Sequence, residues 1–421
     1  MARPSHNPRP RFWHRYKGLP PTVFALSVVS FLNDTSSEII YPLLPAFLFL
    51  TLGATPFAIG LIEGLAESVA SIVKLFSGYL SDRFSRRKLP VFLGYSLAAV
   101  CRPLLAFVTS WPQVLVVRMS DRVGKGIRGA PRDALLADSV PEEKRGLAFG
   151  FNRASDHLGA VVGPIIAFLM LTYLAVDPEN PTATEFQQVF LFASIPVVIG
   201  IFVIVFFVHE DRPPDHAADP NPIKFSLKEF DPNFKRFIFT IALFTLSNST
   251  DAFLLLRAEE AGIAPAMLPL LWMALHFSKV LFSLIGGELS DKFGRKKLIF
   301  AGWMVYALVY AGFGFINAPW QAWLLFIIYG AYFGLTEGVE KALVADLVDT
   351  DKRGTGFGFY NLAFGITVFP ASLIFGYIWY QFGSPAAFIT SAVISLIAAA
   401  LLLTISNPRE QKEKADIAAS S

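Results

Sequence analysis

Long apolar segments, each bounded by glycine, proline or charged residues, dominate this sequence. Of its 421 residues, 54% are hydrophobic and 16% are charged, whereas a soluble domain carries about 25% charged residues. Segments of about 20 apolar residues can cross a bilayer, and only helices satisfy the backbone there without closing a barrel. The sequence therefore predicts an all-α integral membrane protein. The twelve predicted transmembrane helices span 21–50, 56–80, 88–110, 112–138, 146–174, 186–208, 236–258, 265–290, 297–317, 320–347, 354–381 and 385–406.

Lysine and arginine gather in alternate links between these helices. The basic links follow the second, fourth, eighth and tenth helices, and both tails are basic as well. No lysine or arginine occurs near 51–55, 109–112, 175–185, 317–320 or 381–385. Because positively charged loops stay in the cytoplasm, we expect a multi-pass protein of the cell (inner) membrane with both termini cytoplasmic.

The chain contains an internal repeat. Residues 78–90 (GYLSDRFSRRKLP) and 287–299 (GELSDKFGRKKLI) share one pattern and lie 209 residues apart. Residues 134–151 align without gaps to 342–359, at an offset of 208. Both matches lie on the predicted cytoplasmic side, so the two halves must have parallel topology, related by an axis along the membrane normal.

A polar stretch rich in proline and aspartate lies between the two halves. We interpret it as a cytoplasmic linker. The predicted divisions are an N-terminal tail (1–20), an N-terminal six-helix bundle (21–208), the linker (209–235), a C-terminal six-helix bundle (236–407) and a C-terminal tail (408–421).

These repeated motifs resemble the signature of the major facilitator superfamily of secondary transporters. The first copy is matched by Gly78, Leu80, Asp82, Arg83, Arg86 and Arg87, with Ser85 where glycine is usual. The second copy is matched by Gly287, Leu289, Asp291, Lys292, Gly294, Arg295 and Lys296. The resemblance implies the major facilitator fold, in which two six-helix bundles with a parallel pseudo-two-fold repeat work by alternating access.

The fifth predicted helix resembles the antiporter signature of the same superfamily. The matching residues are Gly150, Gly159, Gly163 and Pro164, whereas Ala167-Phe168 replaces the closing glycine pair. This motif favours the proton-coupled efflux branch over importers.

Asp82 and Asp291 each end a predicted helix, where a carboxylate meets the negative end of the helix dipole and needs a partner. The resemblance implies a partner at the start of helix 11 in the opposite half. We therefore expect the two aspartates to latch the cytoplasmic face of the outward-open state. The alternative is that the basic residues only hold the loops inside. The expected cytoplasmic gate comprises Gly78, Asp82, Arg83, Arg86, Arg87, Asp138, Gly287, Asp291, Arg295, Lys296 and Asp346.

The fourth predicted helix carries most of its charged residues on one face, from Arg118 to Arg132. Ions inside a membrane usually face a wet cavity or one another, so a substrate cavity and a structural ion-pair network both remain open. The candidate cavity residues are Asn33, Glu38, Arg118, Asp121, Arg122, Arg153, His157, Asn248, Asp251 and Asn361. In the second half, we expect Glu337 and Lys341 to pair along one helix face and His276 to be a satisfied polar residue.

Acidic residues inside the first half are candidate proton carriers. Glu63 and Glu67 lie one turn apart, and two carboxylates this close disfavour each other's charge, so one can hold a proton. Asp34 lies mid-helix, and the corresponding position of the second half carries Asn248. The asymmetry favours proton coupling in the N-terminal half. The candidates are Asp34, Glu63, Glu67 and Asp156.

The sequence predicts a transporter and not an enzyme. The stretch RVGKGIRG lacks the ending of a phosphate-binding loop, and the six histidines and one cysteine show no metal spacing. We therefore expect no cofactor and no metal, with a proton gradient as the energy source. The expected partners are a small-molecule substrate, protons and the bilayer, without nucleic acid, and the protein is expected to be a monomer.

The predicted function is proton-coupled export of a small polar, anionic or zwitterionic organic compound, such as a drug, metabolite or siderophore. The alternative is a proton-coupled symporter that imports a nutrient. A non-transporting sensor or scaffold would need a soluble module, and the stretch 209–235 is too short for one.

The latch hypothesis makes a testable prediction for Asp82. Asp82→Asn should populate the inward-open state more and slow transport, because the amide cannot balance the charge of the latch. Cysteine labelling at each face of the membrane measures the populations, and Asp177→Asn, in a predicted extracellular link, is the matched control. Unchanged populations and unchanged transport in Asp82→Asn would contradict the latch.

Overall fold

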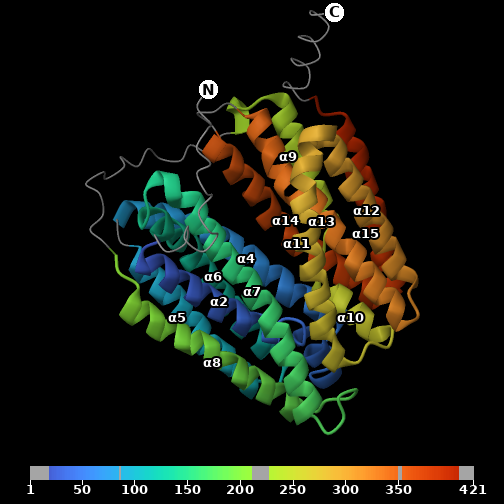
Figure 1. The fold of residues 1–421 in the computed structure, drawn as a ribbon. Coiled ribbons are helices and arrows are strands. Elements are labelled where there is room, and N and C mark those ends of the chain that lie inside the picture. Colours follow the sequence, from blue (N-terminus) through green and yellow to red (C-terminus); the bar gives the residue numbers. More distant parts are fainter. Residues whose placement is uncertain (1–18, 85–86, 211–226, 349–352, 407–421) are drawn as a thin grey trace, which may run out of the picture.

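The computed structural model describes residues 19–84, 87–210, 227–348 and 353–406 (Figure 1). Within these ranges the regular elements are helices, and no strand occurs. The first half contains α2 (Pro21–Ile40), α4 (Pro56–Phe84), α5 (Lys88–Leu104), α6 (Trp111–Asp138), α7 (Glu142–Leu174) and α8 (Ala183–Phe207). The second half contains α9 (Pro232–Ser247), α10 (Ala252–Glu260), α11 (Leu268–Phe293), α12 (Arg295–Phe315), α13 (Pro319–Leu347), α14 (Arg353–Phe382) and α15 (Ser384–Leu403). Short elements are α3 (Leu44–Ala46), η1 (Phe47–Thr51), η2 (Leu105–Phe107), η3 (Leu227–Glu229) and η4 (Pro265–Met267).

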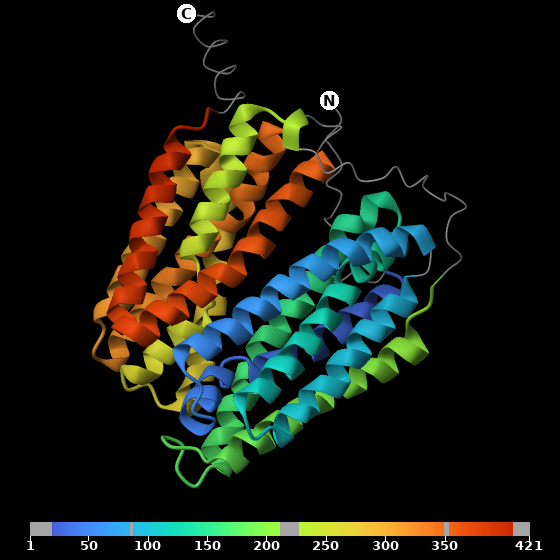
Figure 2. The ribbon, with the colours of Figure 1, turned by 180° about the vertical axis from the view of Figure 1, so that it is seen from behind.

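The two halves form two bundles that lie side by side (Figures 1 and 2). In the first, α2 packs on α7 and α8, and α6 packs on α4 and α5. In the second, α9 packs on α14 and α15, and α13 packs on α11 and α12. The same pairs of helices therefore meet in both halves, which confirms the predicted parallel repeat of two six-helix bundles.

Most of the helices are suited to cross a membrane. Among the described residues, 11 helical segments are long and apolar enough to do so. The charges of α6 exclude it from that set, but α6 has 28 residues, which measure about 42 Å at 1.5 Å per residue, and it packs between α4 and α5. Large apolar side chains such as Phe107, Phe206 and Phe239 are exposed on the outside, as expected of a surface that faces lipid.

The seventh spanning segment is broken, so the prediction of one helix over 236–258 is wrong here. α9 ends at Ser247 and α10 begins at Ala252. The Ser247 hydroxyl donates to a carbonyl one turn earlier, and the Thr250 hydroxyl accepts the Ala252 amide. Such bonds from side chains to the backbone compete with helical bonds and favour a break. The first predicted segment, 21–50, also ends its main helix early, at Ile40.

The two bundles meet through α4 and α14 and through α7 and α11. A Cβ added at Gly60 on α4 would collide with the backbone of Ser372, and one added at Gly64 would collide with the Ser372 side chain. The Ser68 hydroxyl donates to the Gly365 carbonyl across the same seam. Glycine is required here because only a residue without a Cβ lets the two helices approach so closely.

These contacts lie away from what we call the basic end, the end of the bundles that carries Arg87, Lys88 and Lys296. Figures 1 and 2 show the bundles closest at the opposite end and diverging toward the basic end. With the basic end in the cytoplasm, as the distribution of lysine and arginine predicts, this arrangement is the inward-facing one.

The close approach of α4 to α14 predicts that Gly60→Ala lowers the thermal unfolding temperature of the purified protein in detergent. Overpacking of this kind costs about 1–3 kcal/mol, because the two backbones must separate. The matched control is Gly338→Ala, where nothing lies within 4 Å of the added Cβ. The contact would be refuted if Gly60→Ala were as stable as this control.

Candidate functional site

Five of the predicted gate residues have described side chains. Arg87 pairs with Asp138, and the Nη1 atom of Arg295 lies 2.6 Å from an oxygen of Asp346. The repeat offset of 208 relates the two pairs. Each pair joins the start of the third helix of a half to the end of its fourth helix, and Lys296 donates to the Ile405 carbonyl at 2.9 Å. The other expected gate residues lie outside the described side chains, namely Gly78, Asp82, Arg83, Arg86, Gly287 and Asp291.

The charged face of α6 is packed against two carboxylates of α4. The guanidinium group of Arg118 donates two hydrogen bonds to Glu63, at 2.9 and 2.7 Å, and both side chains are buried. One turn further, Arg122 lies 3.2 Å from Glu67, and Lys125 lies 3.9 Å from the same carboxylate. Each of the two glutamates therefore has its own cationic partner, and they do not form an isolated pair of acids.

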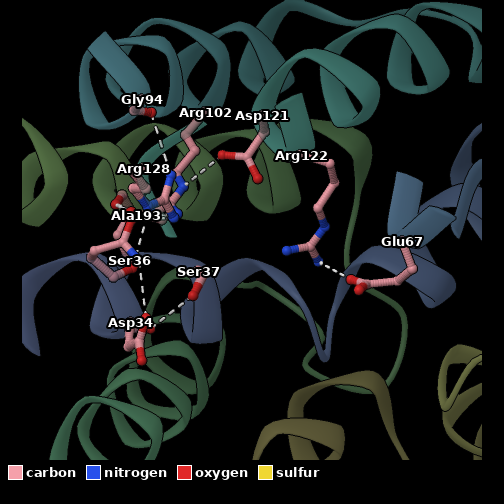
Figure 3. A network of polar contacts seen from close by, with 11 residues as sticks. Asp34, Ser36, Ser37, Glu67, Gly94, Arg102, Asp121, Arg122, Arg128 and Ala193 are labelled. Carbon is pink, nitrogen blue, oxygen red and sulfur yellow. Dashed lines mark hydrogen bonds and ion pairs between the residues drawn. The ribbon is translucent and has the colours of Figure 1, made fainter. Parts of the chain in front are cut away.

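A second group of charges includes Arg102, Asp121 and Arg128, which Figure 3 labels, and it is centred on Asn33 of α2. Arg102 of α5 donates to the backbone carbonyl and to the side-chain oxygen of Asn33, each at 2.9 Å, and lies 3.4 Å from Asp121. Arg128 of α6 donates to the same side-chain oxygen at 3.3 Å. The Asn33 amide in turn donates to Asp34 at 2.9 Å. Asn33 thus accepts hydrogen bonds from Arg102 and Arg128 and donates one to Asp34.

Arg102 is a site residue that the sequence analysis did not single out. It is 4% exposed and is surrounded by groups from α2 and α6. A lone arginine inside a predicted apolar helix was the signal that could have identified it, because such a charge must find partners within the protein.

Three further candidate residues of the first half lie on α7, namely Arg153, Asp156 and His157. The Asp156 carboxylate is buried and lies 3.7 Å from Arg153, and one of its oxygens has no hydrogen-bond partner among the described residues. Arg153 and His157 are exposed, as is Asn361 on α14.

Two glycines of the helix 5 motif hold α7 against α2. A Cβ at Gly159 would collide with the Phe31 carbonyl and crowd Asp34, and one at Gly163 would collide with the Thr35 carbonyl. Gly150 has open space around it. The central part of the motif therefore fits α7 onto the segment of α2 that carries Asp34 and Glu38.

In the second half, many of the side chains in the corresponding region are aromatic, whereas those of the first half are charged. The broken segment between α9 and α10 carries Asn248, which donates to the Tyr332 hydroxyl at 3.3 Å, and Asp251, which accepts from Tyr329 at 2.9 Å. Lys279 of α11 lies 3.8 Å from Asp251. A cluster of aromatic side chains packs behind them, including Phe244, Trp303, Tyr306, Tyr310, Tyr329 and Tyr332.

The expected pair of Glu337 and Lys341 is confirmed, with 3.6 Å between the charged atoms. The expectation for His276 is wrong: its Nε2 atom is buried without a hydrogen-bond partner in the described part of the chain. Sequence spacing along α11 could not reveal this, because the groups facing His276 come from other helices.

One hydrogen bond joins the halves near these residues. The Trp272 indole of α11 donates to the Glu38 carboxylate of α2 at 2.7 Å, and the Tyr41 ring lies 4.9 Å from the Trp272 ring. The predicted cavity residue Glu38 is thus bound to the opposite half.

The comparisons with known proteins agree with this architecture. The family model described as Major Facilitator Superfamily matches residues 26–256 and again 237–420. The chain belongs to this superfamily. An uncharacterized MFS-type transporter of Methanocaldococcus jannaschii is 36% identical over 400 residues, which cover 92% of this chain and 95% of the relative. These matches make the protein a multi-pass membrane protein of a transporter family.

More distant similarities extend across the superfamily. The multi-drug resistance efflux pump PmrA of Streptococcus pneumoniae serotype 4 is 24% identical over 377 residues, with 86% of this chain and 90% of the pump covered. The crystal structure of the nucleoside transporter NupG matches the fold with a TM-score of 0.73 and 15% identity, covering 91% of this chain and 98% of that one.

The buried pair of α6 and α4 predicts a strong effect of Arg118→Met. The substitution leaves the Glu63 carboxylate buried without its cation, which costs about 3–5 kcal/mol, so the unfolding temperature and the yield of folded protein should both fall. The double variant Glu63→Met/Arg118→Met removes both charges and should recover most of the loss. Equal stability of the single variant and the double variant would argue against the pair.

Proposed function

We propose that this transporter is a proton-coupled exporter of a small polar, anionic or zwitterionic organic compound. It works by alternating access between the two bundles, with the proton gradient across the cell membrane as its energy source. In this proposal the basic end faces the cytoplasm together with both termini, and the protein acts as a monomer.

The contact of Gly159 and Gly163 with α2 carries the proposal. These glycines belong to the motif that resembles the antiporter signature, and they pack α7 directly against the backbone next to Asp34 and Glu38. Glu38 on this segment of α2 is also bonded to Trp272 of the opposite half, so movement of one bundle against the other would change the surroundings of this carboxylate. The similarity to the efflux pump PmrA supports the same direction of transport.

Among the candidate proton carriers, Asp34 and Asp156 fit the role better than Glu63 and Glu67. Arg118 and Arg122 hold the two glutamates in ion pairs, so both carboxylates already have cationic partners within the protein. Asp34 instead accepts from the neutral amide of Asn33. We infer that the proton binds at Asp34, with Asp156 as the second candidate.

A mixed set of charges supports a polar substrate. Partly exposed acidic and basic groups occur on both sides of the seam, including Glu38 and Lys125 in the first half and Asp251 and Lys279 in the second. Such a surface can compensate both charges of a zwitterion, or one charge of an anion, whereas a purely lipophilic compound would leave these groups without partners.

Import by proton symport is the second candidate function. The observation that favours it is the incomplete helix 5 motif, in which Ala167 and Phe168 replace the closing glycines. Direction-resolved transport separates the two functions.

For export, a compound selected by a thermal-shift screen should accumulate in inside-out vesicles with an acidic lumen, and Asp34→Asn should abolish the dependence on the pH gradient. Radiolabelled uptake measures both effects. Asp177→Asn, in the link between α7 and α8, is the matched control and should transport like the unmodified protein. Accumulation in right-side-out vesicles driven by inward proton movement would instead establish import.

A further inference from the structure

One face of α11 presents a group of polar and aromatic side chains to the seam between the halves. Trp272, His276 and Lys279 follow one another at spacings of four and three residues, which brings them to the same side of a helix. All three contact groups from other helices. They are therefore a candidate for one continuous binding surface.

The Lys279 ammonium is mostly buried, but it forms no hydrogen bond to any described residue. The nearest oxygen of Asp251 is 3.8 Å away, which is longer than a hydrogen bond. The ammonium lies 3.6 Å from the centre of the Phe333 ring and 5.4 Å from that of Trp272. Asp251 is itself bound by Tyr329 at 2.9 Å. An ammonium group has three donors, so Lys279 retains capacity for an anionic partner.

His276 places a second nitrogen on the same face that has no hydrogen-bond partner among the described residues, and this nitrogen donates in the tautomer that carries the hydrogen on Nε2. Its Nε2 atom is buried and has no hydrogen bond to any described residue. The nearest carboxylate, Glu38, lies 3.9 Å away and already accepts from Trp272. Buried polar atoms are almost always bonded, so this nitrogen also points to a missing acceptor.

Arg118 shows the distances at which a buried cation of this protein is fully bonded to a carboxylate. Arg118 donates two hydrogen bonds to the Glu63 carboxylate at 2.9 and 2.7 Å. Lys279 and His276 have carboxylates only at 3.8 and 3.9 Å. The two nitrogen atoms on α11 therefore match a carboxylate brought by a ligand, whereas Arg118 has no such need.

Aromatic rings flank these nitrogens. The Trp272 ring lies 4.9 Å from Tyr41 and 5.0 Å from His276, and the centre of the Phe333 ring lies 3.6 Å from the Lys279 ammonium. Flat faces of this kind favour a planar ligand, since aromatic rings stack with an offset or meet edge to face.

We propose that Lys279 and His276 bind the carboxylate of a planar, ring-containing organic acid, whose ring packs against Trp272 and Phe333. The inference rests on the proposed transport of an anionic or zwitterionic compound and narrows its substrate class. Asp251 lies 3.8 Å from the Lys279 ammonium and competes with the ligand for it.

The test measures binding of benzoate to the purified full-length protein by quenching of tryptophan fluorescence, with benzamide as the neutral probe of the same shape. Benzoate should bind at least about tenfold more tightly than benzamide, as expected for a hydrogen bond to a charged group. Equal affinity for the two probes, or no binding of benzoate, overturns the proposal. This comparison requires no substitution.

Variants then locate the site. Lys279→Gln should weaken benzoate binding about tenfold or more and leave benzamide unaffected, and Lys279→Arg should retain most of the affinity. Asp251→Asn should strengthen benzoate binding severalfold, because it removes the competing carboxylate. The control is Lys228→Gln, an exposed lysine in η3, which should bind both probes like the unmodified protein. Unchanged benzoate affinity in Lys279→Gln, or weaker binding in Asp251→Asn, overturns the assignment.

Binding is measured without a pH gradient, so its outcome is independent of the vesicle experiment. Preferential benzoate binding without proton-driven export would leave the α11 site in place and refute the exporter. Proton-driven export without preferential binding of benzoate would support the exporter and refute the α11 site.

Discussion

Burial of the α6 charges against α4 is the constraint on which the rest of the structure depends. A single buried guanidinium group inside a bilayer is costly unless it is paired, so Arg118 and Arg122 require Glu63 and Glu67 at short distance. These pairs fix α4 against α6 within the first bundle. Because α4 also carries Gly60, the residue in closest contact with α14, the ion pairs set the position of the seam between the halves.

The equivalent contact in the second bundle keeps the glycines but not the ion pairs. α11 and α13 correspond to α4 and α6 in the repeat, and Gly330 and Gly334 on α13 bring the backbone directly against α11. In the first bundle, Gly126 on α6 meets Ala70 and Val73 of α4 in the same way. Among the described side chains of α11 and α13, no ion pair joins the two helices. The first half therefore uses its buried charges for its own packing, while Lys279 in the second half stays loosely paired.

The hydropathy and the repeat were sufficient to predict the fold, because twelve apolar segments and two parallel halves follow from segment length and motif offset alone. The break at Asn248 could not be predicted, since it depends on bonds from Ser247 and Thr250 to the backbone. The partner of Arg118 was likewise open, because several acids were within reach in the sequence and only packing selects Glu63. The role of Arg102 depends on Asn33 and Asp121, which lie on two other helices.

Trp272 connects the seam with the proposed ligand site. Its indole donates to Glu38 of the opposite half, while its ring lies beside the Lys279 ammonium. Rocking of the bundles that separates α2 from α11 must break the bond to Glu38 and free the ring. A ligand packed on that ring then has different affinities in the two arrangements, and a difference in affinity is what allows a ligand to shift a conformational equilibrium. In the proposed mechanism, this shared residue lets substrate binding and the movement of the halves influence each other.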